Sequence, residues 1–93
     1  MKQFEYMKDY YFEPQQSIED KFLKIEEEYT EIKMGICFNK GNSHIAQEVL
    51  DTILACKNML RKMQDEELID IGTETFKHSV KLNRYLETGK YKK

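Results

Sequence analysis

Residues 18–36, IEDKFLKIEEEYTEIKMGI, decide the fold of this 93-residue chain. Apolar side chains recur there at alternating steps of four and three, which places them on one face of an α-helix: Ile18, Phe22, Ile25, Tyr29, Ile32 and Ile36. Ser17 precedes this run, and Asp20 lies three positions after Ser17, a spacing typical of a helix start. We expect the helix to end near Gly35 and residues 37–42, rich in Asn and Gly, to form a loop.

A second helix is predicted from about residue 43 to residue 63. Asn42 or Ser43 can cap its start, and its apolar positions follow two lines: Ile45, Val49, Ile53, Cys56, Leu60 and Met63 on one, and Ala46, Leu50 and Leu54 on the other. A helix with two apolar lines is expected to be the most buried one. After a weaker segment, Thr73 can cap a last helix that ends at Gly89.

These patterns predict an all-α fold, a small bundle of three main helices or of four. The aromatic-rich residues 1–14 form an N-terminal arm, expected as a short helix or as a segment that covers a groove. Residues 15–89 form the helical domain, and residues 90–93 a frayed tail. A chain this short has a thin core, so we also expect it to assemble with copies of itself.

Composition excludes several classes of protein. The net charge of −2 gives no basic field for nucleic acid, and no apolar run approaches the ~20 residues that span a bilayer. Two cysteines are too few for a disulfide scaffold and indicate reduced thiols in the cytoplasm. We therefore expect a cytoplasmic protein with neither a nucleic-acid partner nor a membrane partner.

Two acidic pairs carry the strongest functional signal. Glu28 and Glu31 lie three positions apart on the first helix, as do Glu48 and Asp51 on the second, so each pair shares one side of its helix. Antiparallel packing across the short loop would set the pairs at matching depth. Four carboxylates at about 4 Å would repel by several kcal/mol, so a cation cancels the charge, some acids are protonated, or the pairs lie apart. Hard oxygen ligands suit Mg²⁺, or Mn²⁺ as a substitute.

The arrangement Glu27-Glu28-x-x-Glu31, then sixteen residues, then Glu48-x-x-Asp51 resembles the EExxE…ExxD signature of the MazG-like, all-α nucleoside triphosphate pyrophosphatases. The likeness covers about residues 18–89. It includes an asparagine within the segment EVLDTILACKNML, and a late cluster of Lys, Asn and Arg residues: Asn58, and then Lys77, Lys81, Asn83 and Arg84.

The resemblance implies a Mg²⁺-dependent pyrophosphohydrolase that cleaves an NTP or dNTP to the monophosphate and pyrophosphate by metal-activated water. It also implies homodimers or homotetramers that share the active site. Carried over, the metal ligands are Glu28, Glu31, Glu48 and Asp51. Glu27 would either support the metal ligands from the second shell or orient the attacking water, and the sequence does not separate this role from one for Glu28.

Substrate contacts are expected from Asn58 and from two basic residues one turn apart, Lys81 and Arg84. Ala55 stands where some relatives carry an aromatic residue that packs on the base, so base recognition must come from elsewhere. The residues considered for it, besides Asn58, are Phe38, Tyr85, Tyr10 and Tyr11. The alternative is a catalytically inactive helical interaction module, an adaptor that keeps the scaffold without the chemistry.

Overall fold

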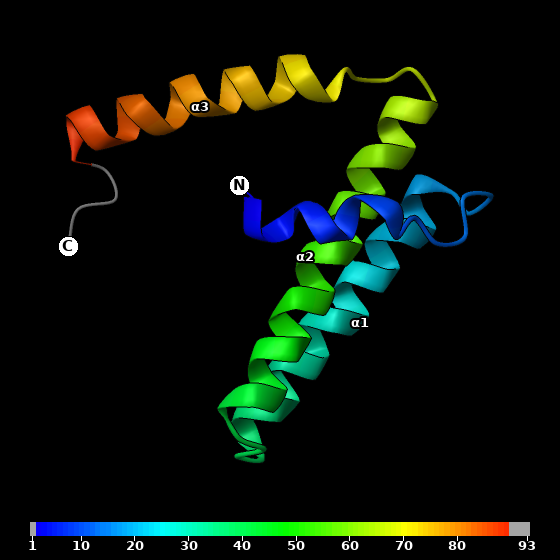
Figure 1. Ribbon diagram of the computed structural model, residues 1–93, viewed down its shortest axis with the longest axis vertical. Helices are drawn as coiled ribbons and strands as arrows, with labels where there is room; N and C mark the ends of the chain where they lie inside the picture. Colours follow the sequence, from blue (N-terminus) through cyan, green and yellow to red (C-terminus); the bar gives the residue numbers. More distant parts are fainter. Residues whose placement is uncertain (1, 90–93) are drawn as a thin grey trace.

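The computed structural model describes residues 2–89, with side-chain surroundings from residue 4 onward (Figure 1). The chain forms a 3₁₀ helix and three α-helices: η1 (Lys2–Asp9), α1 (Ile18–Cys37), α2 (Asn42–Asp65) and α3 (Ile71–Thr88). The described residues contain no strand, which confirms the predicted all-α class. The predicted tail, residues 90–93, lies outside the described part of the chain.

The start of α1 is confirmed as a capping box. The Ser17 hydroxyl accepts a hydrogen bond from the Asp20 backbone N–H, and the Asp20 carboxylate accepts one from the Ser17 N–H. The helix continues to Cys37, two residues further than the expected Gly35. Gly35 is therefore not the C-cap. It lies inside the helix, where it faces α2.

The predicted cap of α2 is wrong. Gly41, at φ 99°, occupies the N-cap position, and no side chain there satisfies the first N–H groups. The turn over residues 38–41 demands a left-handed backbone at this point, which glycine adopts without strain. Asn42 and Ser43 are consequently the first two residues of the helix, after its cap.

Helices α1 and α2 form an antiparallel hairpin with a seven-residue register along its polar edge (Figure 1). Lys21 and Asn58 both bind the backbone of Phe12. Seven residues further on α1 and seven back on α2, the carboxylates of Glu28 and Asp51 lie together. A further seven residues along each helix, Gly35 lies against His44, and a Cβ on the glycine would be 3.5 Å from the imidazole. The hairpin therefore fixes the relative depth of the two acidic pairs.

Helix α3 leaves this hairpin and extends away from it (Figure 1). Its cap is Asp70, whose carboxylate accepts from the Thr73 N–H and hydroxyl, both at 2.9 Å, so the predicted cap at Thr73 is displaced by three residues. The predicted end is confirmed, with Gly89 at φ 73°. Phe76 on α3 is 69% exposed. The described residues thus show three main helices, but only α1 and α2 pack along their lengths.

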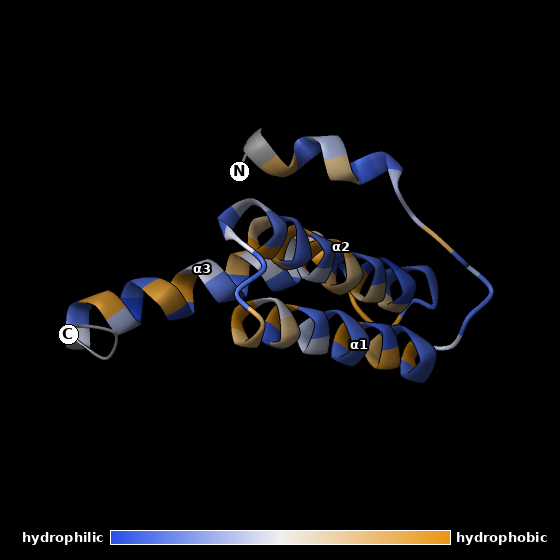
Figure 2. Ribbon diagram, turned by 90° about the horizontal axis from the view of Figure 1, so that it is seen from below, coloured by the Kyte–Doolittle hydropathy of each residue, from blue (hydrophilic) through white to orange (hydrophobic). Residues whose placement is uncertain are grey.

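The N-terminal arm begins as a short helix, one of the two forms expected of it. Helix η1 crosses α2, and Figure 2 shows it on the α2 side of the hairpin, standing off from α1. Residues 10–17 then run as an irregular segment to the start of α1. Met7 of η1 and Ala55 of α2 are the only buried apolar side chains among residues 4–89. The arm therefore supplies part of a small core.

Much apolar surface stays uncovered within one chain. Figure 2 shows hydrophobic segments along α3, away from the hairpin. On α1, three exposed side chains follow one line at seven-residue spacing: Phe22, Tyr29 and Ile36. No helix in residues 2–89 is long and apolar enough to cross a membrane.

Candidate metal centre

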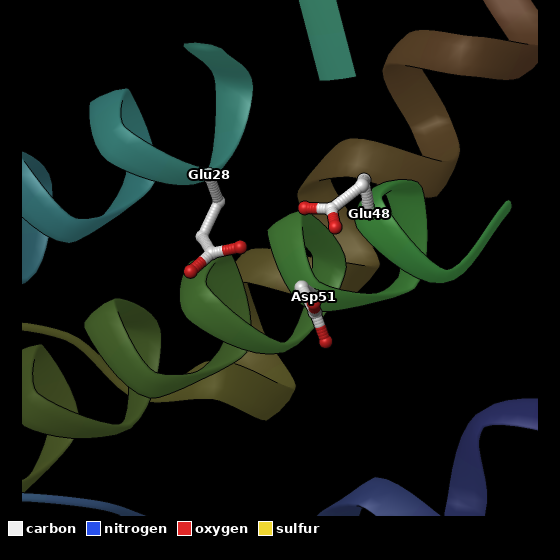
Figure 3. Close-up of side chains that lie close together, drawn as sticks. All are labelled: Glu28, Glu48 and Asp51. Atoms are coloured by element: carbon white, nitrogen blue, oxygen red, sulfur yellow. The ribbon is translucent and has the colours of Figure 1, made fainter. Parts of the chain in front are cut away.

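Three carboxylates from two helices converge in the middle of the hairpin (Figure 3). Glu28 comes from α1, and Glu48 and Asp51 come from α2; one carboxylate oxygen of each lies within 4.8 Å of the other two. The side chains of Glu28 and Glu48 are only 13% and 16% exposed, whereas Asp51 lies at the surface. The acids therefore face a shared space that remains open to solvent on the Asp51 side.

Local structure explains why these three meet. Glu48 and Asp51 are three residues apart on α2, so they project from the same side of that helix. Glu28 reaches them because the seven-residue register of the hairpin places it opposite Asp51. Glu31, the fourth predicted ligand, is exposed one turn further along α1 and is not part of the group. The structure therefore brings together three of the four predicted ligands.

A lysine compensates part of the negative charge. The Lys24 ammonium lies 2.9 Å from a carboxylate oxygen of Glu28 and 2.9 Å from one of Glu27. These hydrogen bonds, first to Glu28 and then to Glu27, raise the pKa of Lys24 well above its ordinary value. Glu27, a predicted catalytic residue, is thus held beside the triad without belonging to it. Lys24 lies three and four residues before these glutamates, a spacing that could have revealed it in the sequence.

A histidine borders the triad on the other side. His44 Nε2 lies 3.5 Å from a carboxylate oxygen of Glu48, one turn along α2, and the two form an ion pair when the imidazole is protonated. Three carboxylates within 4.8 Å repel one another by about 3–4 kcal/mol per pair at an effective dielectric of 20. A divalent cation would relieve more of this repulsion than Lys24 alone, and oxygen donors of this kind fit Mg²⁺ or Mn²⁺.

A groove of about 810 Å³ opens beside the triad and runs toward the N-terminal arm. Glu28 and Asp51 line one end of it, and Phe12 and Asn58 line the other. Between them the lining is apolar at Leu23 and Leu54, and it carries both basic and acidic side chains: Lys21, Lys24, Asp20 and Glu27. This volume lies within the ~300–1,000 Å³ typical of small-molecule sites.

Asn58 binds the arm at the far end of the groove. Its side-chain oxygen accepts from the Phe12 N–H at 2.8 Å, and its amide nitrogen donates to the carbonyls of Tyr10 and Leu54, both at 3.0 Å. The residue is 8% exposed, and the protein backbone uses its oxygen and nitrogen. The structure gives Asn58 the role of anchoring the arm, and its direct contact with a substrate stays a prediction.

Lys21 anchors the arm from the α1 side. Its ammonium donates to the carbonyl of Phe12 and, at 2.8 Å, to that of Glu13. Desolvation by burial, followed by the positive charge of Lys62, lowers the pKa of Lys21. Lys62 itself donates to the carbonyl of Pro14 at 2.9 Å. Buried side chains of the two helices therefore hold the arm through its backbone.

The remaining predicted contacts lie away from the triad. Lys81 and Arg84 belong to the distal half of α3, which points away from the hairpin (Figure 1), and the Lys81 ammonium lies 5.6 Å from the Tyr85 ring. Phe38 is exposed in the turn after α1. The cations that line the groove are instead Lys21 and Lys24, which the sequence alone did not single out.

Of the two arm tyrosines considered for base recognition, Tyr11 is already engaged. Its ring lies 4.5 Å from the Arg61 guanidinium and 5.2 Å from the Lys21 ammonium, measured to the ring centroid. Burial, and then the Asp65 carboxylate, raise the pKa of Tyr11. Tyr11 therefore packs the arm onto the hairpin, and its ring does not line the groove.

Comparison of the chain with protein-family models, with curated proteins and with solved structures gives no match. Any function of this chain must therefore be inferred from its own residues and their geometry.

Proposed function

We propose that this protein is a Mg²⁺-dependent nucleoside triphosphate pyrophosphohydrolase, which releases pyrophosphate and leaves a nucleoside monophosphate. The observation that carries the proposal is the convergence of Glu28, Glu48 and Asp51 at the end of a nucleotide-sized groove. The spacing of these acids, which resembles that of the MazG-like family, supports it. Both cysteines are free, in keeping with a cytoplasmic enzyme.

The triad is the set of residues that would hold Mg²⁺. When bound, the ion neutralises charge on the phosphates and lowers the pKa of the attacking water. Glu31, on the next turn of α1, is the residue we assign to complete the ligand set once substrate binds. The enzyme needs no nucleophilic side chain, because water is the nucleophile of this reaction.

Glu27 is the residue we assign to hold the attacking water, since it lines the groove beside Glu28 and lies outside the triad. The water oxygen bonds to the α-phosphorus, and the bond from that phosphorus to the oxygen bridging to the β-phosphate breaks. Pyrophosphate leaves with the bridging oxygen, and the water proton passes to the Glu27 carboxylate. Lys24 keeps Glu27 in place and adds positive charge near the phosphates.

The decisive experiment measures pyrophosphate release from a panel of NTPs and dNTPs with Mg²⁺. Glu28→Gln and Asp51→Asn each remove one ligand charge while keeping the shape of the side chain. Each should lower kcat/KM by at least about a hundredfold, because loss even of an outer-shell partner of a metal costs about 10- to 100-fold. Circular dichroism should show unchanged helicity in both variants.

Glu26→Gln is the matched control, since Glu26 is an exposed glutamate of the same helix outside the triad and outside the groove lining. It should retain the activity of the wild type. Near-normal turnover in both Glu28→Gln and Asp51→Asn would end the proposal. Glu31→Gln then shows whether a fourth carboxylate takes part, through a loss comparable to that of Glu28→Gln.

We also propose that the active form is a homodimer or homotetramer. Phe22, Tyr29 and Ile36 form an uncovered apolar line on α1, and Phe76 and Leu86 are exposed on α3. A second copy that packs on these surfaces would cover both, and it would offer a route for Lys81 and Arg84 of one chain to approach the triad of another. A single-chain mass by light scattering at micromolar concentration would contradict this assembly.

A second candidate is a catalytically inactive adaptor that binds another protein through its exposed apolar surfaces. The observation in its favour is Lys24, which neutralises part of the triad without any metal. The two candidates differ in their response to Mg²⁺: only a metal site predicts that the ion stabilises the folded protein.

A further inference from the structure

Phe12 combines a fixed backbone with a free ring. Its N–H donates to Asn58 and its carbonyl accepts from Lys21, and these two anchors are only 8% and 4% exposed. The Phe12 ring is nevertheless uncovered, with the residue 55% exposed. The hydrogen bonds of two buried polar side chains thus hold one aromatic residue at a defined place beside the groove.

Neighbouring contacts distinguish Phe12 from Tyr11. The rings of Tyr10 and Phe12 lie 6.1 Å apart, so these alternate residues project to one side of the arm. Tyr11 projects to the other side and reaches Arg61, about one turn beyond Asn58 toward the end of α2. Phe12, unlike Tyr11, lines the groove that extends from the arm to Glu28 and Asp51.

We propose that the Phe12 ring is the surface on which the base of the nucleotide stacks. This inference rests on the proposed function and deepens it, because it makes the N-terminal arm part of the substrate site. The phosphates would lie at the Glu28 and Asp51 end, and the base would lie at the arm end of the same groove.

The lining between these two ends suits such a ligand. Leu23 and Leu54 provide apolar walls for the base. The charges between the two ends are mixed, with Lys24 beside Asp20 and Glu27, so the phosphates depend on the Mg²⁺ proposed at the triad. Ala55, also in the lining, has a small side chain that leaves room for a planar ring beside Phe12. An aromatic platform accepts any base through its π-face, so Phe12 sets affinity for the base more than the choice among bases.

A fluorescence titration tests this placement directly, because the chain contains no tryptophan. Phe12→Trp introduces a single indole at the proposed platform, and Tyr6→Trp introduces one on the same arm at a residue of like exposure, 56%, outside the groove. The probe is a nucleoside triphosphate with a non-hydrolysable α,β-methylene bridge, together with Mg²⁺. We expect it to quench the emission of Phe12→Trp and not that of Tyr6→Trp.

Inorganic triphosphate with Mg²⁺ is the second probe, since it carries the phosphates without the base. It should leave the emission of Phe12→Trp unchanged while competing with the nucleotide analogue. Equal quenching by both probes would overturn the proposal, because the phosphates rather than the base would then lie at Phe12. Equal quenching of the two tryptophan variants by the analogue would overturn it as well.

Kinetics of pyrophosphate release separate this inference from the proposed function. Phe12→Ala should raise KM about tenfold or more and change kcat by less than about threefold, while Phe12→Tyr keeps the wild-type KM. A wild-type KM in Phe12→Ala, with Glu28→Gln inactive, refutes the platform and leaves the enzyme standing. A wild type that releases no pyrophosphate refutes the enzyme, and the titration then decides whether Phe12 meets a base at all.

Discussion

Two polar sites lie seven residues apart on the polar edge of the α1–α2 hairpin. At the upper site, Lys21 and Asn58 are nearly buried, and backbone groups of the N-terminal arm accept or donate their hydrogen bonds. At the lower site, Glu28, Glu48 and Asp51 place like charges within 4.8 Å, with one lysine and one histidine beside them. The same helices thus carry one polar site whose hydrogen bonds are supplied by the arm and one whose negative charge is only partly compensated.

This difference indicates which buried polar residues stabilise the chain and which are available to a ligand. Hydrogen bonds to a buried group favour the fold when every partner is supplied by the protein. Clustered carboxylates work against the fold unless a cation arrives. Changes at the upper site should therefore affect stability first, and changes at the lower site should affect metal binding and catalysis first.

The largest effect on stability is expected from Asn58→Ala. It leaves the Phe12 N–H and the Tyr10 carbonyl without their partner, which should lower the free energy of unfolding by about 2 kcal/mol. Urea denaturation measures the change, and Asn83→Ala, an exposed asparagine on α3, is the matched control. Similar losses in the two variants would mean that the upper site is no more structural than the surface.

A smaller stabilisation is expected from Mg²⁺ at the lower site. A ligand that binds only the folded state at ten times its Kd adds about 1.4 kcal/mol to the free energy of unfolding. The melting temperature of the wild type should therefore rise with Mg²⁺, and that of Glu28→Gln should not. EDTA should reverse the rise. A melting temperature of the wild type that does not change with Mg²⁺ would favour the adaptor. It would also mean that the lower site is not a metal site.

The smallest expected effect is opposite pH dependence at the two lysines, whose ordinary pKa is 10.5. Because the pKa of Lys21 is lowered by folding, its contribution to stability should grow as the pH rises toward 10.5. Because that of Lys24 is raised, its contribution should stay constant below 10.5 and decline above it. Unfolding free energies of Lys21→Met and Lys24→Met, each subtracted from the wild type between about pH 8 and 11, test both signs.

Local sequence signals predicted the helices well, and long-range contacts set the limits. The capping box at Ser17 and the glycine end at Gly89 depend on residues a few positions away, and both are confirmed. The course of α3 depends on what its apolar side chains meet, and one chain offers them few partners. For this reason the helix was predictable and its placement in a closed bundle was not.

The candidate site divides in the same way. Helical spacing placed Glu48 and Asp51 on one side of α2, and antiparallel pairing placed Glu28 opposite them. Glu31 shares a side of α1 with Glu28, but spacing alone does not fix how far its carboxylate reaches. Asn58 anchors Phe12 across 46 positions of the sequence. Because the hydrogen bond is made by the Phe12 backbone N–H, no pattern of side chains predicts it.

That separation of 46 residues also orders events in time. The ribosome makes the arm before α2, and at about 5–20 residues per second several seconds pass between the synthesis of Phe12 and that of Asn58. Although the arm is synthesised before α2, it can dock only after the hairpin has brought Lys21 and Asn58 together. Pulsed hydrogen exchange during refolding should find the Phe12 amide protected later than those of α1 and α2.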